Sequence, residues 1–220
     1  MSVQARNNVV VKGQGPLTLV FAHGFGCDQN MWRMVEPTFA KRYRTVLFDM
    51  VGCGKSDVGA YDIDKYSTLA GYAEDIVEII QEFKQGPVVF IGHSVGAMAG
   101  VMAANLSPGL ISAHAMVGPS PSYITDEDYP GGFTRDDIDA LLSTLESNYL
   151  GWSSAMAPRI MGNSNFIAPR AVGEYLTQVI DDCRMVLVEN EGHCPHLSQP
   201  AACIEAIQTF LDQTCGHLPA

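Results

Sequence analysis

Residues 88–105 read VVFIGHSVGAMAGVMAAN, and this stretch decides the fold. Its first four residues form an apolar run typical of a buried strand, and the residues after Ser94 are typical of a helix. A serine at this junction, flanked by Gly92 and Gly96, has the pattern of a nucleophile elbow, since glycine leaves room where strand and helix crowd together. The stretch therefore predicts an enzyme whose nucleophile is Ser94.

Short apolar runs alternate with helical patterns along the rest of the chain. The runs predict strands at residues 9–11, 17–22, 45–48, 88–91, 113–117 and 185–188. The helical patterns cover residues 31–40, 68–83, 95–105, 171–180 and 201–211. This order predicts an α/β fold with a mostly parallel sheet, helices on both faces and ligands at the carboxyl ends of the strands. Residues 13–16 predict a hairpin-like turn after the first strand.

One segment, residues 121–165, interrupts the alternation with two helix-like stretches at 134–148 and 151–161. We therefore expect a single domain over residues 1–220, with a helical cap inserted at 121–165. The apolar side chains of the cap either pack it onto the body or line a pocket, and both can hold at once.

Composition excludes several classes of partner. The chain has 220 residues, 47% hydrophobic content, a formal net charge of −11 and a pI of about 4.8. Binding to nucleic acid or to an anionic membrane needs clustered Lys and Arg, so neither partner is expected. No leader peptide and no membrane span are recognisable, which predicts a cytoplasmic protein, and its six cysteines are expected to be reduced.

The strand ends supply partners for Ser94. The loop His23-Gly24-Phe25-Gly26 follows the second strand. A hydrolase with a nucleophile elbow places one N–H of its oxyanion hole on this loop and the other on the residue after the nucleophile, so the predicted donors are Phe25 and Val95. The general base is expected on a loop after the last strand, which gives His193. His23 and His93 are expected to pack or to form hydrogen bonds, and His196 is expected to make a loop or cap contact.

Two other sites are disfavoured. His193, Cys194 and His196 match no usual zinc spacing, so no metal is expected. The stretch 52–56, GCGKS, lacks the first glycine of a phosphate loop, because Asp49 stands there, and no helix pattern follows Ser56.

Taken together, residues 23–29 (HGFGCDQ), 48–52 (FDMVG), 92–97 (GHSVGA) and 192–196 (GHCPH) resemble a known family. It is the α/β-hydrolases that include bacterial regulators of the general stress sigma-factor pathway and the plant karrikin and strigolactone receptors. The likeness covers nearly the whole chain, and residues 117–123 and 129–133 resemble its cap entry.

This resemblance implies a catalytic Ser94 and His193, an oxyanion hole at Phe25 and Val95, and a small apolar pocket for a compact ester or lactone. The implied pocket residues are Phe25, Tyr123, Phe133, Leu141, Trp152 and Met156. No cofactor is implied. In the plant receptors, hydrolysis of a butenolide-like ligand is coupled to partner binding, and the bacterial relatives work with a signalling protein, so a signalling partner is a further expectation.

The chain departs from the family at the third member of the catalytic triad. Family members are about fifty residues longer, and the shortfall falls between Gly162 and Ile167, where a sheet strand would carry the triad aspartate. Asn165 remains near that position, and Asp126 or Asp128 could substitute. A natural or engineered deletion, an omitted segment and a designed minimal enzyme all fit the sequence.

Two functions follow from these residues. The first is a serine hydrolase of the carboxylesterase or lactonase type, whose activity the lost aspartate impairs. The alternative is a ligand-sensing or partner-binding hydrolase-like protein with slow or lost catalysis. A cofactor-free haloperoxidase or acyltransferase on the same scaffold is a weaker third reading.

Overall fold

The computed structural model describes residues 1–160, 167–189 and 192–215. They form two compact units. The first, here called the body, comprises residues 1–117 and the segment from Pro200 onward, and the second, called the insert, is Gly118–Gln199. Among the described residues, no helix is long and apolar enough to span a bilayer.

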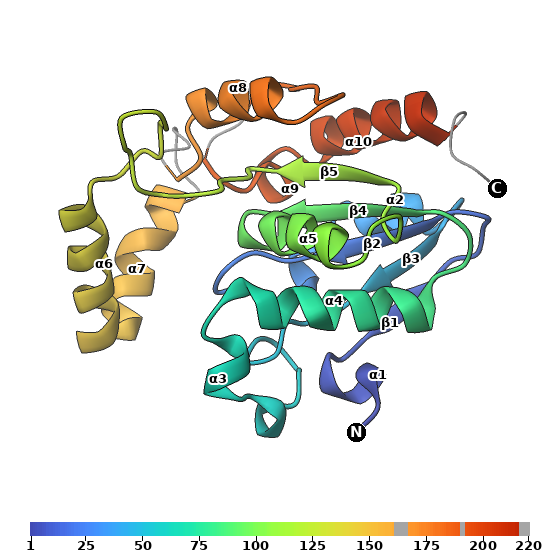
Figure 1. Ribbon diagram of the computed structural model, residues 1–220, viewed down its shortest axis with the longest axis horizontal. Coiled ribbons are helices and arrows are strands. Elements are labelled where there is room, and N and C mark those ends of the chain that lie inside the picture. The colour runs from blue at the N-terminus through green and yellow to red at the C-terminus, as the bar shows by residue number, and fades with distance from the viewer. Residues whose placement is uncertain (161–166, 190–191, 216–220) are drawn as a thin grey trace. The chain divides into compact units, whose positions relative to one another are not determined.

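The body is built on one five-stranded sheet of order β1-β3-β2-β4-β5 (Figure 1). Every neighbouring pair is parallel except β1 and β3. The strands are β1 (Val10–Lys12), β2 (Thr18–Ala22), β3 (Arg44–Leu47), β4 (Val88–His93) and β5 (Ala113–Val117). The five strands predicted before residue 120 and the mostly parallel sheet are therefore confirmed.

The expected hairpin between the first two strands is wrong, because β1 pairs with β3. At the turn, Gly13 has a φ of 63° and approaches the carbonyl oxygens of Ala40 and Tyr43, where a Cβ atom would overlap them. The chain thus passes beside the segment that leads into β3, and it returns to the sheet on the far side of that strand.

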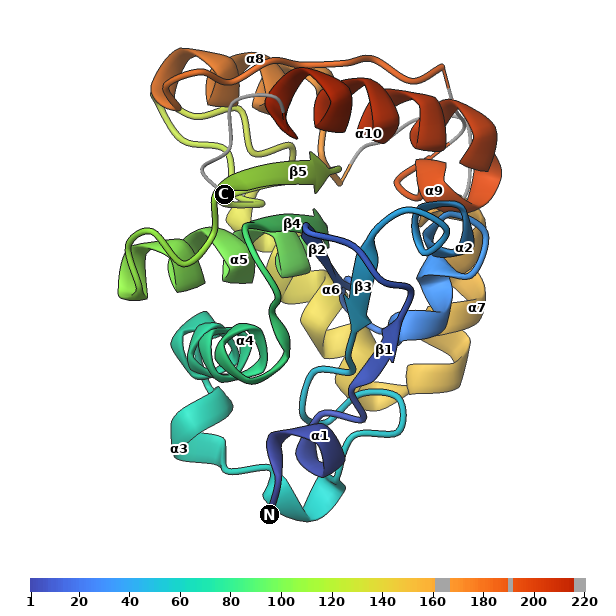
Figure 2. The same ribbon diagram turned by 90° about the vertical axis from the view of Figure 1, so that its right-hand side faces the viewer.

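Helices cover both faces of the sheet, as predicted (Figures 1 and 2). On one face, Val20 and Ala22 pack in a cluster with residues of α4 (Leu69–Phe83) and α5 (Val95–Leu106). On the other, Leu19 and Phe21 pack with residues of α2 (Glu36–Phe39) and α10 (Pro200–Cys215). Successive strand residues point to opposite faces, so unbroken apolar runs suit a sheet buried on both sides.

The remaining helices complete the two units. In the body they are α1 (Val3–Arg6), η1 (Gln29–Trp32), η2 (Val58–Ala60) and α3 (Ile63–Tyr66). In the insert they are α6 (Arg135–Ser147), α7 (Tyr149–Ile160), α8 (Arg170–Val179) and α9 (Pro195–Ser198). The helix predicted over residues 31–40 is divided between η1 and α2. Pro37 lies in the first turn of α2, where a missing N–H costs no helical hydrogen bond, so a helix that begins just before it is favoured over one that runs through it.

The predicted strand at residues 185–188 is not present. Residues 184–189 have no regular secondary structure, and the Val186 and Leu187 side chains are 65% and 57% exposed. A strand is stable only when a neighbour accepts and donates its ladder hydrogen bonds. The strand order of the sheet ends at β5, and among the described residues this segment forms no ladder with another strand.

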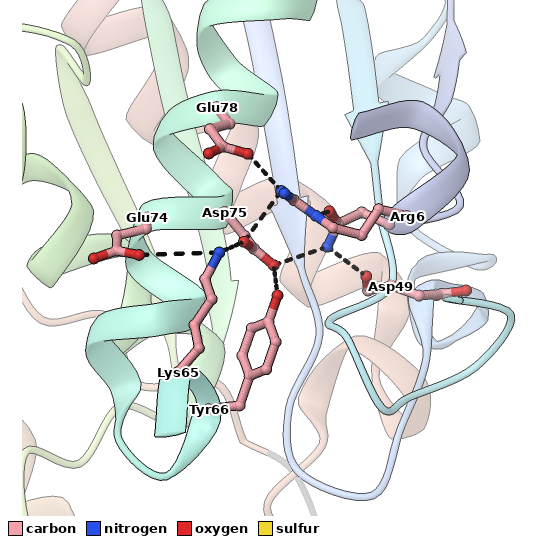
Figure 3. A network of polar contacts seen from close by, with 8 residues as sticks. Arg6, Asp49, Lys65, Tyr66, Glu74, Asp75 and Glu78 are labelled. Atoms are coloured by element: carbon pink, nitrogen blue, oxygen red, sulfur yellow. Dashed lines mark hydrogen bonds and ion pairs between the residues drawn. The ribbon is translucent and has the colours of Figure 1, made fainter. Parts of the chain in front are cut away.

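The N-terminal helix is joined to α4 by a buried charged network (Figure 3). Its centre is the carboxylate of Asp75, of which 2% is exposed. Arg6 Nη2 lies 3.1 Å from Asp75 Oδ1, Lys65 Nζ lies 2.7 Å from the same oxygen, and the Tyr66 hydroxyl donates to Oδ2 at 2.9 Å. Arg6 also contacts Glu78, at 2.7 Å.

Replacing Asp75 with asparagine is expected to lower the free energy of unfolding by about 3 kcal/mol, because two partly buried cations lose their shared counter-ion. Urea denaturation measures this loss. Glu78→Gln is the matched control: that carboxylate is 47% exposed, so its loss costs less than about 1 kcal/mol. Equal midpoints for the two variants would show that the network contributes little.

Candidate active site

Ser94 occupies the junction of β4 and α5 in a strained conformation. Its φ of 53° and ψ of −124° lie in a backbone region that residues other than glycine rarely adopt. β4 ends at His93 and α5 begins at Val95, so Ser94 forms the turn and occupies the N-cap position of the helix. Its backbone N–H donates to the carbonyl oxygen of Val117, the last residue of β5, at 2.9 Å. The body thus has the strained strand-to-helix turn that the sequence predicts.

The two glycines of the motif are required by close packing. A Cβ atom on Gly92 would lie 2.5 Å from the Cα atom of Ala97, inside the first turn of α5. One on Gly96 would overlap the backbone carbonyl oxygen of His23. Any side chain at either position would push α5 away from the strands and displace Ser94.

The loop after β2 lies against the turn. A Cβ atom on Gly24 would overlap Nδ1 of His93 and would lie 3.3 Å from the Cβ atom of Ser94. The structure therefore brings the Gly24–Phe25 peptide beside the serine. Val95 is the first residue of α5, where a backbone N–H has no acceptor within the helix. The side chain of Phe25 is 66% exposed.

His23 is buried and hydrogen-bonded through both ring nitrogens, which confirms its predicted structural role. The backbone N–H of Met50 donates to Nε2 at 2.9 Å, and Nδ1 lies 2.9 Å from the carbonyl oxygen of Gly24. Burial lowers the pKa of His23, although the Gly24 carbonyl and Asp49 oppose this effect. The imidazole is accordingly held in its neutral form.

Asp49 is a structural residue whose role the sequence did not reveal. Its carboxylate is 1% exposed and accepts the backbone N–H groups of Gln29 and Lys55, each at 2.9 Å, and the Asn8 side-chain amide at 2.7 Å. It therefore ties the N-terminal segment and two loops to the end of β3. In the sequence, the one indication of this structural role is the position of Asp49, an acidic residue directly after a predicted buried strand.

Residues 52–56 form turns and not a phosphate loop, as expected. Gly52 and Gly54 have φ angles of 89° and 57°, and a Cβ atom on Gly54 would lie 2.6 Å from Cγ of Asp49. The element that follows is η2, a short 3₁₀ helix that begins at Val58, so no helix N-terminus faces this turn.

His193 belongs to the insert. It is 5% exposed, its backbone N–H donates to the carbonyl oxygen of Ile160 at 2.6 Å, and its ring lies against Gly118, where a Cβ atom would be 3.0 Å from Cε1. Burial lowers the pKa of His193 to about 4. The imidazole is therefore neutral at pH 7, which is the form that accepts a proton. His196, in α9, is fully buried.

Apart from Phe25, which belongs to the body, the predicted pocket residues lie in the insert. The backbone N–H of Phe133 donates to the carbonyl oxygen of Tyr123 at 3.0 Å, so these two residues are neighbours. Leu141 lies on α6, and Trp152 and Met156 lie on α7. Met156 is 7% exposed. That these residues bind a substrate remains a prediction.

The third member of the triad is not identified. Asn165 lies outside the described residues. Asp126 and Asp128 share an exposed turn, in which the Asp126 carboxylate accepts the backbone N–H of Asp128 at 3.1 Å. Asp181 and Asp182 are turn residues, as predicted, and Asp182 has a φ of 55°.

Residues 18–154 match the family described as alpha/beta hydrolase fold. The chain is 36% identical over 213 residues to Karrikin insensitive 2 receptor CA of Petunia hybrida, covering 94% of this chain and 79% of that one. It is 38% identical to Strigolactone esterase D14 of Arabidopsis thaliana over 168 residues, covering 76% of this chain and 62% of that one. The chain thus spans less than two thirds of the length of this second relative.

A solved structure is also similar over most of the chain. It is olei00960, a hydrolase from Oleispira antarctica, with a TM-score of 0.90, 30% identity and 96% of each chain covered.

Proposed function

Since this chain belongs to the α/β-hydrolase family, we propose that it is a serine esterase or lactonase that acts on small apolar esters or lactones. The observation that carries the proposal is the strained backbone of Ser94, with the Gly24–Phe25 peptide against it. Relatives named as esterases support the reaction class.

In the proposed reaction, the Ser94 hydroxyl attacks the carbonyl carbon of the substrate while His193 takes its proton. The N–H groups of Phe25 and Val95 stabilise the oxyanion of the tetrahedral intermediate. His193 then gives the proton to the leaving oxygen, and an acyl-enzyme remains. Water, deprotonated by the same imidazole, releases the acid. The reaction needs no cofactor.

The protonation state of His193 supports it as the base. Its ring is neutral at pH 7, because burial lowers its pKa to about 4. The proposed dyad requires its imidazole to reach the Ser94 hydroxyl.

Covalent labelling tests the nucleophile. A serine-reactive fluorophosphonate is expected to add one label per chain, read by intact mass and located on Ser94 by peptide mapping. The Ser94→Ala variant is expected to remain unlabelled, and Ser112→Ala, which changes an exposed serine after α5, is expected to react like the wild type. Label on any other residue would remove Ser94 from the mechanism.

The rate should depend on pH through His193. A base with a pKa of about 4 stays unprotonated down to that pH, so kcat/KM is expected to be level from pH 8 to pH 5 and to fall as the pH drops through 4. An unperturbed histidine would give the same fall near pH 6.5. A stopped assay with a neutral ester measures the profile, and a midpoint above pH 6 would rule out a buried neutral base.

A second function is favoured by the 36% identity to a protein named as a karrikin receptor. In this alternative the chain binds a butenolide-like ligand and a signalling partner, and catalysis is slow or absent. A rise in melting temperature with a butenolide that persists in Ser94→Ala would support it. The absence of any shift, together with no partner in a pull-down, would remove it.

A further inference from the structure

The oxyanion donor of the loop after β2 shares a peptide unit with a hydrogen-bond acceptor. The carbonyl group of Gly24 and the N–H group of Phe25 belong to the same planar peptide, and in a trans peptide they point in opposite directions. Any contact that fixes the direction of the Gly24 carbonyl therefore also fixes the direction of the Phe25 N–H.

The ring of His23 makes that contact in one tautomer. Nε2 accepts the backbone N–H of Met50 at 2.9 Å, so it carries a lone pair and the ring proton is on Nδ1. Nδ1 lies 2.9 Å from the Gly24 carbonyl oxygen and therefore donates to it. The opposite tautomer would place two donors together at Nε2 and two acceptors together at Nδ1.

The two backbone groups that are hydrogen-bonded to the His23 ring lie in segments that other residues hold in place. Met50 follows Asp49, whose carboxylate is fixed by three donors, so the amide that selects the tautomer is itself immobilised. The Gly24 N–H is in contact with Sδ of Met31 at 3.4 Å. On the other side, Gly96 packs directly on the backbone carbonyl of His23.

We propose that His23 is a positioning residue, which orients the Gly24–Phe25 peptide so that the Phe25 N–H is directed at the oxyanion and the Nδ1–H tautomer is required. The inference rests on the proposed function for its catalytic meaning. His23 is in contact with the segments that carry both proposed donors. Its side chain fixes the direction of the Phe25 N–H, and its backbone carbonyl group packs against Gly96, the residue after Val95.

Two amide variants separate the two ring nitrogens. In His23→Asn, the side-chain NH₂ replaces Nδ1–H and can still donate to the Gly24 carbonyl. In His23→Gln, the side-chain oxygen replaces Nε2 and can still accept from Met50, but the donor to Gly24 is lost. Each variant loses one buried hydrogen bond, so similar losses of stability are expected in urea denaturation.

Catalysis is expected to distinguish them. His23→Gln should lower kcat for p-nitrophenyl acetate by about 10²-fold with KM nearly unchanged, because an oxyanion donor is lost. His23→Asn should keep kcat within about threefold of the wild type, since the peptide stays oriented. Equal losses of kcat in both variants, in step with their stability, would overturn the inference and leave the proposed function standing.

A spectroscopic measurement tests the geometry without turnover. A long-range ¹H–¹⁵N spectrum of the Ser94→Ala protein should show His23 protonated at Nδ1 and unprotonated at Nε2. The amide resonance of Phe25 should move in His23→Gln and stay in place in His23→Asn. A proton on Nε2, or equal Phe25 shifts in both variants, would overturn the inference. The expected spectra from a chain without esterase activity would overturn only the proposed function.

Discussion

The Ser94→Ala variant is expected to lose at least about 10²-fold in kcat for p-nitrophenyl acetate. In the proposed mechanism the serine hydroxyl is the group that becomes acylated, so without it only the proposed oxyanion donors and substrate binding remain to assist attack by water. These two effects still supply a rate above the uncatalysed reaction in a serine protease that lacks its triad.

The size of the loss in kcat indicates whether a third residue, an acid, assists Ser94 and His193. In a serine protease with a complete triad, removing the serine costs about 10⁶-fold and removing the acid alone about 10⁴-fold, so a serine–histidine pair without an acid contributes about 10²-fold. A loss near 10² in Ser94→Ala would therefore indicate a dyad. A loss near 10⁶ would indicate that another carboxylate orients His193.

The Ser112→Ala control should retain wild-type turnover, and circular dichroism should show that both variants are folded. His193→Ala should lose as much kcat as Ser94→Ala, because in the proposed mechanism the two groups act as one unit. Full activity in Ser94→Ala would assign the hydrolysis to another group and remove the elbow from the mechanism.

The second large effect is expected for Gly96→Ala. Its methyl group would overlap the carbonyl oxygen of His23, a backbone atom that cannot rotate away, so α5 must move outward. Overpacking of this kind costs about 3 kcal/mol. A displacement of about 1 Å also misplaces Ser94 and the Val95 N–H, which is expected to lower kcat by about 10²-fold.

Gly59→Ala provides the matched control for this substitution. Gly59 is exposed in η2, and its added methyl group would meet only the Asp57 carboxylate, at 3.1 Å, which can move aside. We expect a change in unfolding free energy within about 0.5 kcal/mol and no change in kcat. If urea denaturation and kinetics show the same for Gly96→Ala, the close approach of α5 to His23 is not required.

The parts of the fold that the sequence predicts well are those whose cause is local. β4, Ser94 and α5 are specified by neighbouring residues, because an apolar run, two glycines and a small-residue helix occur within one short stretch. The geometry of the turn follows from the same glycines, so both could be predicted together.

The failures have non-local causes. Residues 185–188 are apolar enough for a strand, but among the described residues they form no ladder with another segment. Strand pairing depends on segments that are distant in the sequence. Likewise, β1 pairs with β3 because the path of Gly13 is set by Ala40 and Tyr43. The importance of Asp49 could not be predicted, since the donors around it come from three separate segments.

The body is assembled from the two ends of the chain, and this has a consequence for its biosynthesis. The cluster on one face of the sheet contains Phe21 and Trp32 from early in the sequence, together with Ile207 and Leu211 from α10. While the ribosome is still translating the insert, that face has no α10 to cover it. The nascent polypeptide therefore exposes this apolar surface until α10 has been synthesised and has folded onto it, and during that time the surface favours aggregation.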